Sequence, residues 1–252
     1  DFIIGRNERR CWKNTHRAGF MVRATINGLM SDTRLPDDAR NIISELVSEL
    51  ESLRKTSDRQ KLRLRAIDDN LASAASLQRD FFPRTSPKFK GVQLATLHLP
   101  ADRVSGDFYD VARIDESHVG LFLADPTGHG FSAGLLGAFA FGAARRATAS
   151  FPMEPNLVLA AVNAEILDAR LSECQFVTAV YAVYDERKRV VTWSRAGAPY
   201  PVSVEFDRGV TEIRSEGPML GVSSATAGAF AVCSRNLGDG ASLFFHTDGI
   251  ES

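Results

Sequence analysis

The sequence has little cysteine, no long apolar run and no excess of one sign of charge. Its 252 residues include three cysteines, Cys11, Cys174 and Cys233, which are widely spaced and form no C-x-x-C pair. This pattern argues against a disulfide framework and a zinc site, and it is typical of a reducing compartment. Lysine and arginine number 30 against 31 aspartates and glutamates, a formal net charge of −1. The bulk charge therefore indicates neither nucleic acid nor an acidic membrane as a partner.

No apolar stretch reaches the ~20 residues that a bilayer-spanning helix needs. The first ten residues contain charges without an apolar segment after them, so they do not form a secretory signal. We therefore expect these residues to be cytoplasmic, with no membrane contact. The chain begins without Met and ends at Ser252 inside an apparent structural unit, which we interpret as a fragment cut at both ends. The domain that begins near residue 88 is then incomplete at its C-terminus.

Three zones differ in pattern. Residues 1–36 are mixed and contain a basic cluster, which we interpret as the solvated tail of an unassigned upstream region. Residues 37–83 are predicted to form one helix, with acidic residues at its start and Pro83 at its end. Residues 88–252 are predicted to form the folded domain.

The long helix carries a heptad pattern. Thirteen positions spaced alternately by four and three residues run through it, and ten of them are apolar. This period of 3.5 is typical of a coiled-coil seam, so we expect a homodimer through residues 39–81. The alternative is an amphipathic helix that lies on its own domain. The seam positions are Ala39, Ile43, Leu46, Leu50, Leu53, Ser57, Gln60, Leu64, Ile67, Leu71, Ala74, Gln78 and Phe81.

From residue 88 onward the pattern predicts strands, then two consecutive helices, then hairpins. This order indicates an α+β fold, with antiparallel sheets flanked by helices rather than alternating βα units. The helices are expected at 131–150 and 156–171. The strands are expected at 92–99, 108–114, 119–125, 176–185, 189–196, 201–206, 210–214, 229–234 and 241–248.

Three aspartates lie where apolar strands begin or end. Asp107 opens one strand, Asp125 ends a second, and Asp248 ends a third. Carboxylates at the ends of separate strands can converge on one point, and Mg²⁺ and Mn²⁺ prefer such oxygen ligands. Taken singly, each Asp-Gly or Asp-Pro pair is also compatible with an ordinary turn. The residues alone leave both interpretations open.

A set of motifs resembles the SpoIIE/RsbU-type branch of the PPM (metal-dependent, type 2C) serine/threonine phosphatases. The resemblance covers roughly residues 77–252, and the order and the intervals of the motifs agree as well. The strings are SGDFYDV (105–111), LFLADPTGHGFSAGLL (121–136), FVTAVYAVYD (176–185), RAGAPYPV (195–202), GPMLGV (217–222) and FFHTDGIES (244–252).

The resemblance implies a β-sandwich flanked by helices, with two Mn²⁺ or Mg²⁺ ions at one end. It implies that Asp107, Asp125 and Asp248 are metal ligands and that Pro126 offers its backbone carbonyl. No side chain is then the nucleophile, because metal-activated water attacks the phosphorus directly. Residues next to these ligands are expected to support them: Gly106, Gly128, His129, Gly130 and Gly249.

The implied function is hydrolysis of phosphoserine or phosphothreonine on a regulatory protein in bacterial signalling, with an anti-anti-sigma (STAS-type) protein as the substrate by analogy. The preceding coiled coil would gate the enzyme. The sequence departs from the family where the string Asn-Ala-Gly-His reads Arg195-Ala196-Gly197-Ala198. A non-catalytic, dimeric docking module is therefore the alternative. A third reading takes 128–134 as a dinucleotide-binding turn, but Asp125 would repel the pyrophosphate and the expected following strand is absent.

Overall fold

The computed structural model describes residues 28, 36–85, 88–89, 91–171, 175–205 and 209–250. The chain divides into two compact units, residues 1–68 and residues 69–252, and the boundary falls within a helix. Each unit is described by itself. Among the described residues, no helix combines the length and the apolar character that a membrane span requires.

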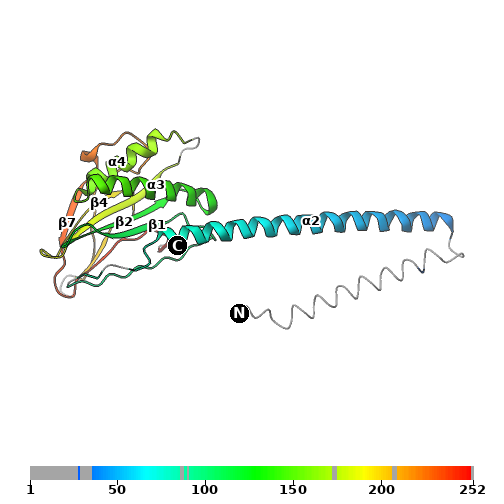
Figure 1. The fold of residues 1–252 in the computed structure, drawn as a ribbon, viewed down its shortest axis with the longest axis horizontal. Coiled ribbons are helices and arrows are strands. Elements are labelled where there is room, and N and C mark those ends of the chain that lie inside the picture. Colours follow the sequence, from blue (N-terminus) through cyan, green and yellow to red (C-terminus); the bar gives the residue numbers. More distant parts are fainter. Residues whose placement is uncertain are drawn as a thin grey trace. The chain divides into compact units, whose positions relative to one another are not determined.

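Helix α2 (Asp37–Phe81) is the long helix that the heptad pattern predicts (Figure 1). It begins after Pro36 with Asp37 and Asp38 in its first turn, where carboxylates favour the positive end of the helix dipole. In the first unit, apolar seam side chains are exposed rather than covered by the rest of the chain. These are Leu46, Leu50, Leu53, Leu64 and Ile67.

The last turns of α2 belong to the second unit and pack on it. The ring of Phe81 lies 6.3 Å from that of Phe108 and 5.9 Å from that of Phe141, measured between centroids. The side chain of Gln78 is buried in the same unit. Two positions of the predicted seam therefore contact their own domain, and the stretch left for a partner helix ends at Ala74.

The second unit is built on a five-stranded antiparallel sheet in the order β1-β2-β3-β4-β7. Its central strand β3 is buried on both faces, which explains its nearly continuous apolar sequence. The strands are β1 (Phe108–Arg113), β2 (His118–Pro126), β3 (Val177–Asp185), β4 (Val190–Ala196) and β7 (Val232–Asn236).

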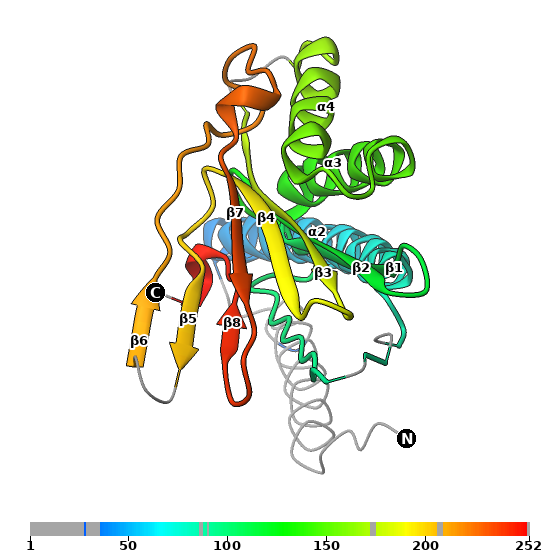
Figure 2. The same cartoon turned by 90° about the vertical axis from the view of Figure 1, so that its left-hand side faces the viewer.

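A second, three-stranded sheet has the order β6-β5-β8. It consists of β5 (Val202–Glu205), β6 (Gly209–Glu212) and β8 (Ser242–Phe244). Figure 2 shows the helices α3 (Gly130–Ser150) and α4 (Pro155–Asp168) on one side of the larger sheet and the smaller sheet on the other. The unit is therefore a sandwich of antiparallel sheets flanked by helices, as predicted.

Two apolar clusters follow from the two buried faces of β3. On the helix side, Ala179, Tyr181 and Val183 join α3 and α4 residues such as Phe141 and Leu159 in one cluster. On the other face, Val180, Ala182 and Tyr184 form a second cluster. They pack against Trp193 of β4, Leu243 of β8 and Phe245, the residue after β8. Successive side chains of a strand point to opposite faces, so one strand contributes to both cores.

The predicted strand at 92–99 is wrong, because the structure assigns no ladder to these residues. Its alternation of apolar side chains reflects one half-buried face: Leu94 is partly covered, whereas Leu97 is 82% exposed. The strand predicted at 229–234 is shifted, since residues 227–229 form a short 3-10 helix, η1 (Ala227–Ala229), before β7. The strand predicted at 241–248 is shorter than expected and ends at Phe244.

Helix α3 approaches β1 so closely that a glycine is required at the contact. A Cβ built on Gly137 would lie 2.4 Å from the backbone oxygen of Gly106 and 2.5 Å from the ring of Phe108. A Cβ on Gly142, in the same helix, would meet only the Arg146 guanidinium at 3.5 Å. The two glycines therefore test packing and helix propensity separately.

We expect Gly137→Ala to lower the free energy of unfolding by about 1–3 kcal/mol, because the added methyl forces α3 and β1 apart. Gly142→Ala should instead raise it by about 0.5–1 kcal/mol, because alanine loses less backbone entropy in a helix. Urea unfolding of both variants measures the difference. Equal effects of the two substitutions would contradict the close approach.

Candidate metal centre

Strand β2 brings Asp125 and Pro126 to one end of the larger sheet. Its last two residues pair with Thr178 and Val177 of β3, and the hydroxyl of Thr178 donates to the backbone oxygen of Asp125 at 3.3 Å. Pro126 is buried, and a Cβ built on Gly106 would lie 3.8 Å from its carbonyl oxygen. Gly106 therefore lies beside this carbonyl.

Asp107 lies one residue before β1, and two hydroxyl groups fix its position. The backbone N–H of Asp107 donates to Oγ of Ser105 at 3.1 Å. Its carboxylate accepts a hydrogen bond from Oγ1 of Thr247 at 2.9 Å, a residue 140 positions later in the chain. This second bond joins the start of β1 to the segment after β8. It places Asp248, the first residue of the 3-10 helix η2 (Asp248–Ile250), next to Asp107.

Asp125 is the carboxylate most affected by this arrangement. Burial, followed by the negative charges of Asp107 and Asp248, raises its pKa to about 7. The closeness of both carboxylates favours the protonated form of Asp125. The three aspartates that the sequence predicts to converge are thus brought together, and their charges strongly disfavour full ionisation.

A cleft of about 250 Å³ opens beside these carboxylates. Sequence reasoning singled out only Asp125 and Asp248 among its walls. The other lining residues are Thr178, Gly197, Pro199, Tyr200, Glu212 and His246. Tyr200 and its loop could have been found from the string RAGAPYPV, where this sequence departs from the family pattern. Glu212 lies at the end of a short exposed strand and has no motif that marks it.

The loop from β2 to α3 contains the predicted supporting residues Gly128, His129 and Gly130. Both glycines have positive φ angles, +92° and +71°, which a side chain would strain. His129 is exposed, precedes the first residue of α3, and its side chain makes no cap hydrogen bond. Gly249 follows Asp248 within η2 and lines a different pocket, which Asp107 also lines. The structure thus gives His129 no contact with the three carboxylates.

The donor chemistry of the centre is entirely oxygen: three carboxylates and one backbone carbonyl. Among the described residues, no three Asp, Glu, His or Cys side chains already lie in a metal-holding geometry. Carboxylate and carbonyl oxygens are the ligands that Mg²⁺ and Mn²⁺ prefer, and cations relieve the repulsion that raises the pKa of Asp125. The residues present therefore fit divalent cations.

Gln78 of α2 also belongs to this region, although the heptad pattern predicts it to lie in the coiled-coil seam. Its side-chain amide donates to the backbone oxygen of Ser105 at 2.7 Å and accepts from the Ser105 backbone N–H at 2.9 Å. Ser105 in turn accepts the backbone N–H of Asp107. The last turns of α2 are thus two hydrogen bonds away from a predicted metal ligand. The sequence does contain a signal for this contact, because Gln78 is a polar residue at a heptad position that is usually apolar.

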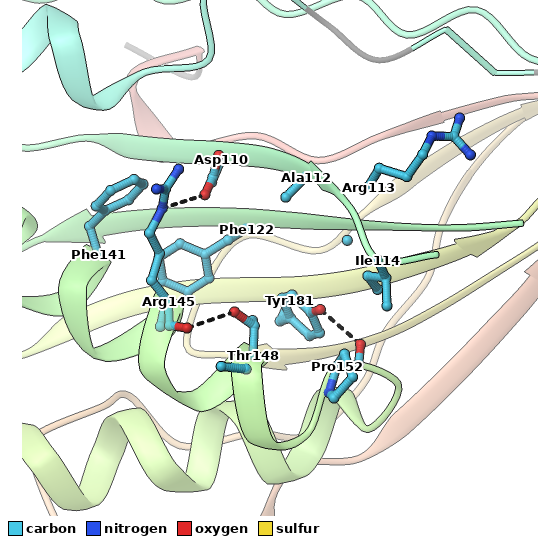
Figure 3. Close-up of a pocket in the computed structure, with 13 residues that line it drawn as sticks. Asp110, Ala112, Arg113, Ile114, Phe122, Phe141, Arg145, Thr148, Pro152 and Tyr181 are labelled. Carbon is cyan, nitrogen blue, oxygen red and sulfur yellow. Dashed lines mark hydrogen bonds and ion pairs between the residues drawn. The ribbon is translucent and has the colours of Figure 1, made fainter. Parts of the chain in front are cut away.

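A larger cavity of about 470 Å³ lies between β1 and the C-terminal half of α3 (Figure 3). Arg145 Nε donates to a carboxylate oxygen of Asp110 at 2.9 Å there, and the hydroxyl of Tyr181 donates to the carbonyl of Pro152 at 2.9 Å. None of the predicted site residues lines this cavity. The carboxylate cleft is therefore the candidate site, although it is smaller.

The sequence matches a known protein family. The model of the family "Stage II sporulation protein E (SpoIIE)" matches residues 115–251, more than half of the chain. The chain therefore belongs to the SpoIIE family. It is 26% identical over 168 residues to the phosphoserine phosphatase RsbU of Bacillus subtilis (strain 168), covering 64% of this chain and 48% of RsbU. The chain thus spans about half the length of this curated relative.

Two solved structures share the fold. The SiaA-PP2C domain of Pseudomonas aeruginosa superimposes with a TM-score of 0.58 at 22% identity, over 73% of each chain. The PP2C phosphatase domain of SpoIIE from Bacillus subtilis, with a fragment of its regulatory domain, gives 0.50 at 19% identity, over 58% of this chain and 42% of that one. These similarities confirm a PP2C-type fold.

We expect Gln78→Ala to lower the free energy of unfolding by about 2–3 kcal/mol, because it removes two hydrogen bonds and leaves the buried Ser105 N–H unpaired. Gln93→Ala is the matched control, since Gln93 is exposed, and it should change stability by less than about 0.5 kcal/mol. Urea unfolding provides the measurement. A loss for Gln78→Ala no larger than the control's would show that this contact does not hold α2 to the domain.

Proposed function

We propose that this chain contains a metal-dependent protein phosphatase that hydrolyses phosphoserine or phosphothreonine on a regulatory protein. The observation that carries the proposal is the convergence of Asp107, Asp125 and Asp248 at one end of a PP2C-type fold, where Asp125 and Asp248 line a cleft. Membership of the SpoIIE family and the similarity to a phosphoserine phosphatase support it. The catalytic domain is assigned to residues 88–252 and the helical linker to residues 37–83.

The proposed metal ligands are the carboxylates of Asp107, Asp125 and Asp248 and the carbonyl of Pro126. When bound, two Mn²⁺ or Mg²⁺ ions make water nucleophilic near neutral pH and stabilise the charge of a phosphoryl group. Asp125 would hold the ions together with Asp107 and Asp248. Burial and the charges of these two carboxylates raise its pKa to about 7, which supports the proposal that all three lie close enough to share cations.

The remaining residues of the centre position these ligands. Thr247 and Ser105 hold Asp107 from two sides, and Thr178 holds the backbone of Asp125. Electrostatic stabilisation is most effective when such groups are oriented before the reaction begins. The cleft of about 250 Å³ is smaller than the ~300–1,000 Å³ typical of small-molecule sites. A phosphorylated side chain on a protein surface is therefore the substrate that suits it.

By analogy with the relatives, the substrate is a phosphorylated regulatory protein of anti-anti-sigma (STAS) type, and the site of action is the cytoplasm. The similarity to RsbU, a phosphoserine phosphatase, supports hydrolysis of phosphoserine. The exposed apolar seam of α2 supports a homodimer of this chain, now confined to residues 39–74. Because Gln78 at the end of α2 contacts the Asp107 loop, the helix can transmit dimer geometry to the metal centre.

Asp125→Asn should lower kcat/KM for an aryl phosphate at least about 100-fold in the natural full-length protein with Mn²⁺, because it removes a direct ligand rather than an outer partner. Asp239→Asn is the matched control, since Asp239 is 94% exposed and lies away from the cleft. Phosphate release and Mn²⁺ calorimetry measure the two properties. A folded protein that neither binds Mn²⁺ nor releases phosphate would instead be a docking module.

Leu53→Lys should convert the protein from dimer to monomer at micromolar concentration, because it places a charge in the seam. Leu62→Lys is the matched control: Leu62 and Leu53 are on the same helix and are 64% and 60% exposed, but Leu62 is off the seam. Sedimentation velocity distinguishes the species, and circular dichroism checks that the helix is retained. A monomeric unsubstituted protein would contradict the seam.

A further inference from the structure

We propose that Arg214, beside the ring of Tyr200, forms a basic rim on the carboxylate cleft that selects phosphoserine segments with an acidic residue next to the phosphoserine. The inference rests on the proposed function and names the substrate's sequence preference. It begins from the charge of the cleft. Among its described lining residues are three carboxylates, Asp125, Glu212 and Asp248, and no lysine or arginine.

Two arginines lie over the ring of Tyr200, which lines the cleft. The guanidinium of Arg195 lies 4.3 Å from the centroid of the ring, and that of Arg214 lies 5.7 Å from it. Arginine is attracted to the face of an aromatic ring, more strongly where water is excluded. Arg214 also lies 3.6 Å from the carboxylate of Glu212. Arg214 therefore contacts two lining residues of the cleft and lies at its rim.

Arg195 and Arg214 have different roles. Arg195 is only 8% exposed, and it donates to the backbone oxygens of Ala198 and Ser215. Its Nε has no hydrogen-bond partner among the described residues. The cation is thus committed to holding the two loops that meet behind Tyr200. A further bond, from the backbone N–H of Gly197 to the oxygen of Gly217 at 2.9 Å, joins the same loops.

Arg214 is free to change partners. Its side chain is 77% exposed, and its ion pair with the half-exposed Glu212 is long. Exposed pairs of this kind contribute at most about 1 kcal/mol, so a carboxylate of a substrate can replace Glu212 at little cost. The planar guanidinium can also bind a carboxylate through two parallel hydrogen bonds. Tyr200, held by Arg195, fixes where that contact is made.

The position of Arg214 favours a flanking residue over the phosphate. Cations held by Asp107, Asp125 and Asp248 would attract the phosphate, whereas Arg214 lies beside Tyr200 and Glu212 at the exposed side of the cleft. A residue adjacent to the phosphoserine in sequence passes this rim. Complementary charge there governs which segment binds and how fast.

The test uses the natural full-length protein with Mn²⁺ and two phosphoserine peptides that differ only in having Glu or Lys on both sides of the phosphoserine. The unsubstituted protein should hydrolyse the Glu peptide with a kcat/KM about 5-fold to 10-fold higher. Arg214→Gln should abolish this preference, and Arg214→Glu should reverse it. Arg187→Glu, in the exposed β3–β4 turn, is the matched control and should keep it.

An aryl phosphate has no flanking residues, so it tests the proposed phosphatase activity separately from the basic rim. If the aryl phosphate is hydrolysed but Arg214→Glu leaves the peptide ratio unchanged, the basic rim is wrong and the phosphatase assignment stands. If the unsubstituted protein prefers the Lys peptide, Glu212 rather than Arg214 selects the flanking residue, and the proposal is wrong. Failure of the unsubstituted protein to hydrolyse the aryl phosphate and both peptides would contradict the proposed function, and the inference with it.

Discussion

The repulsion among three carboxylates at one end of the sandwich is the constraint on which the site depends. Asp107, Asp125 and Asp248 come from segments far apart in the chain, and burial adds to the cost of charge on Asp125. The fold must hold them together against this cost. The apolar contact of α3 and α4 with the larger sheet supplies favourable free energy at about 25 cal/mol per Å² of buried apolar surface. Divalent cations bound there would offset the repulsion.

The strand ends in the sequence made a convergence of these carboxylates possible, and the family resemblance turned this possibility into a prediction. Asp125 follows a run of apolar residues that stops at a proline, and the strand stops there too. Asp248 lies near Asp107, as predicted, although β8 already ends at Phe244. The hydrogen bond from Thr247 to Asp107 holds this segment in place. The strand at 92–99 could not be excluded from its alternation, since alternation reports which face is covered and not whether a neighbouring strand provides hydrogen bonds.

The heptad pattern of α2 shows a different limit of sequence reasoning. A period of 3.5 identifies an apolar stripe but not the surface that covers it. Gln78 and Phe81 continue the stripe, yet they contact their own domain. The polar residue at position 78 is accounted for by its two hydrogen bonds to Ser105, which a coiled-coil interface would not provide. One helix therefore has an exposed stripe in one unit and an anchored end in the other.

The loop at residues 195–198, which departs from the family pattern, contains a buried cation, Arg195, close to the carboxylates of the site. A guanidinium removed from water is costly unless its donors are satisfied, and Arg195 meets two backbone oxygens but no carboxylate among the described residues. A carboxylate partner there would add another negative charge near Asp125 and Asp248. Backbone oxygens and the Tyr200 ring offer partial negative charge without a titratable group. The loop is thereby held rigidly beside the cleft, and the specificity of its rim can change without changing the metal ligands.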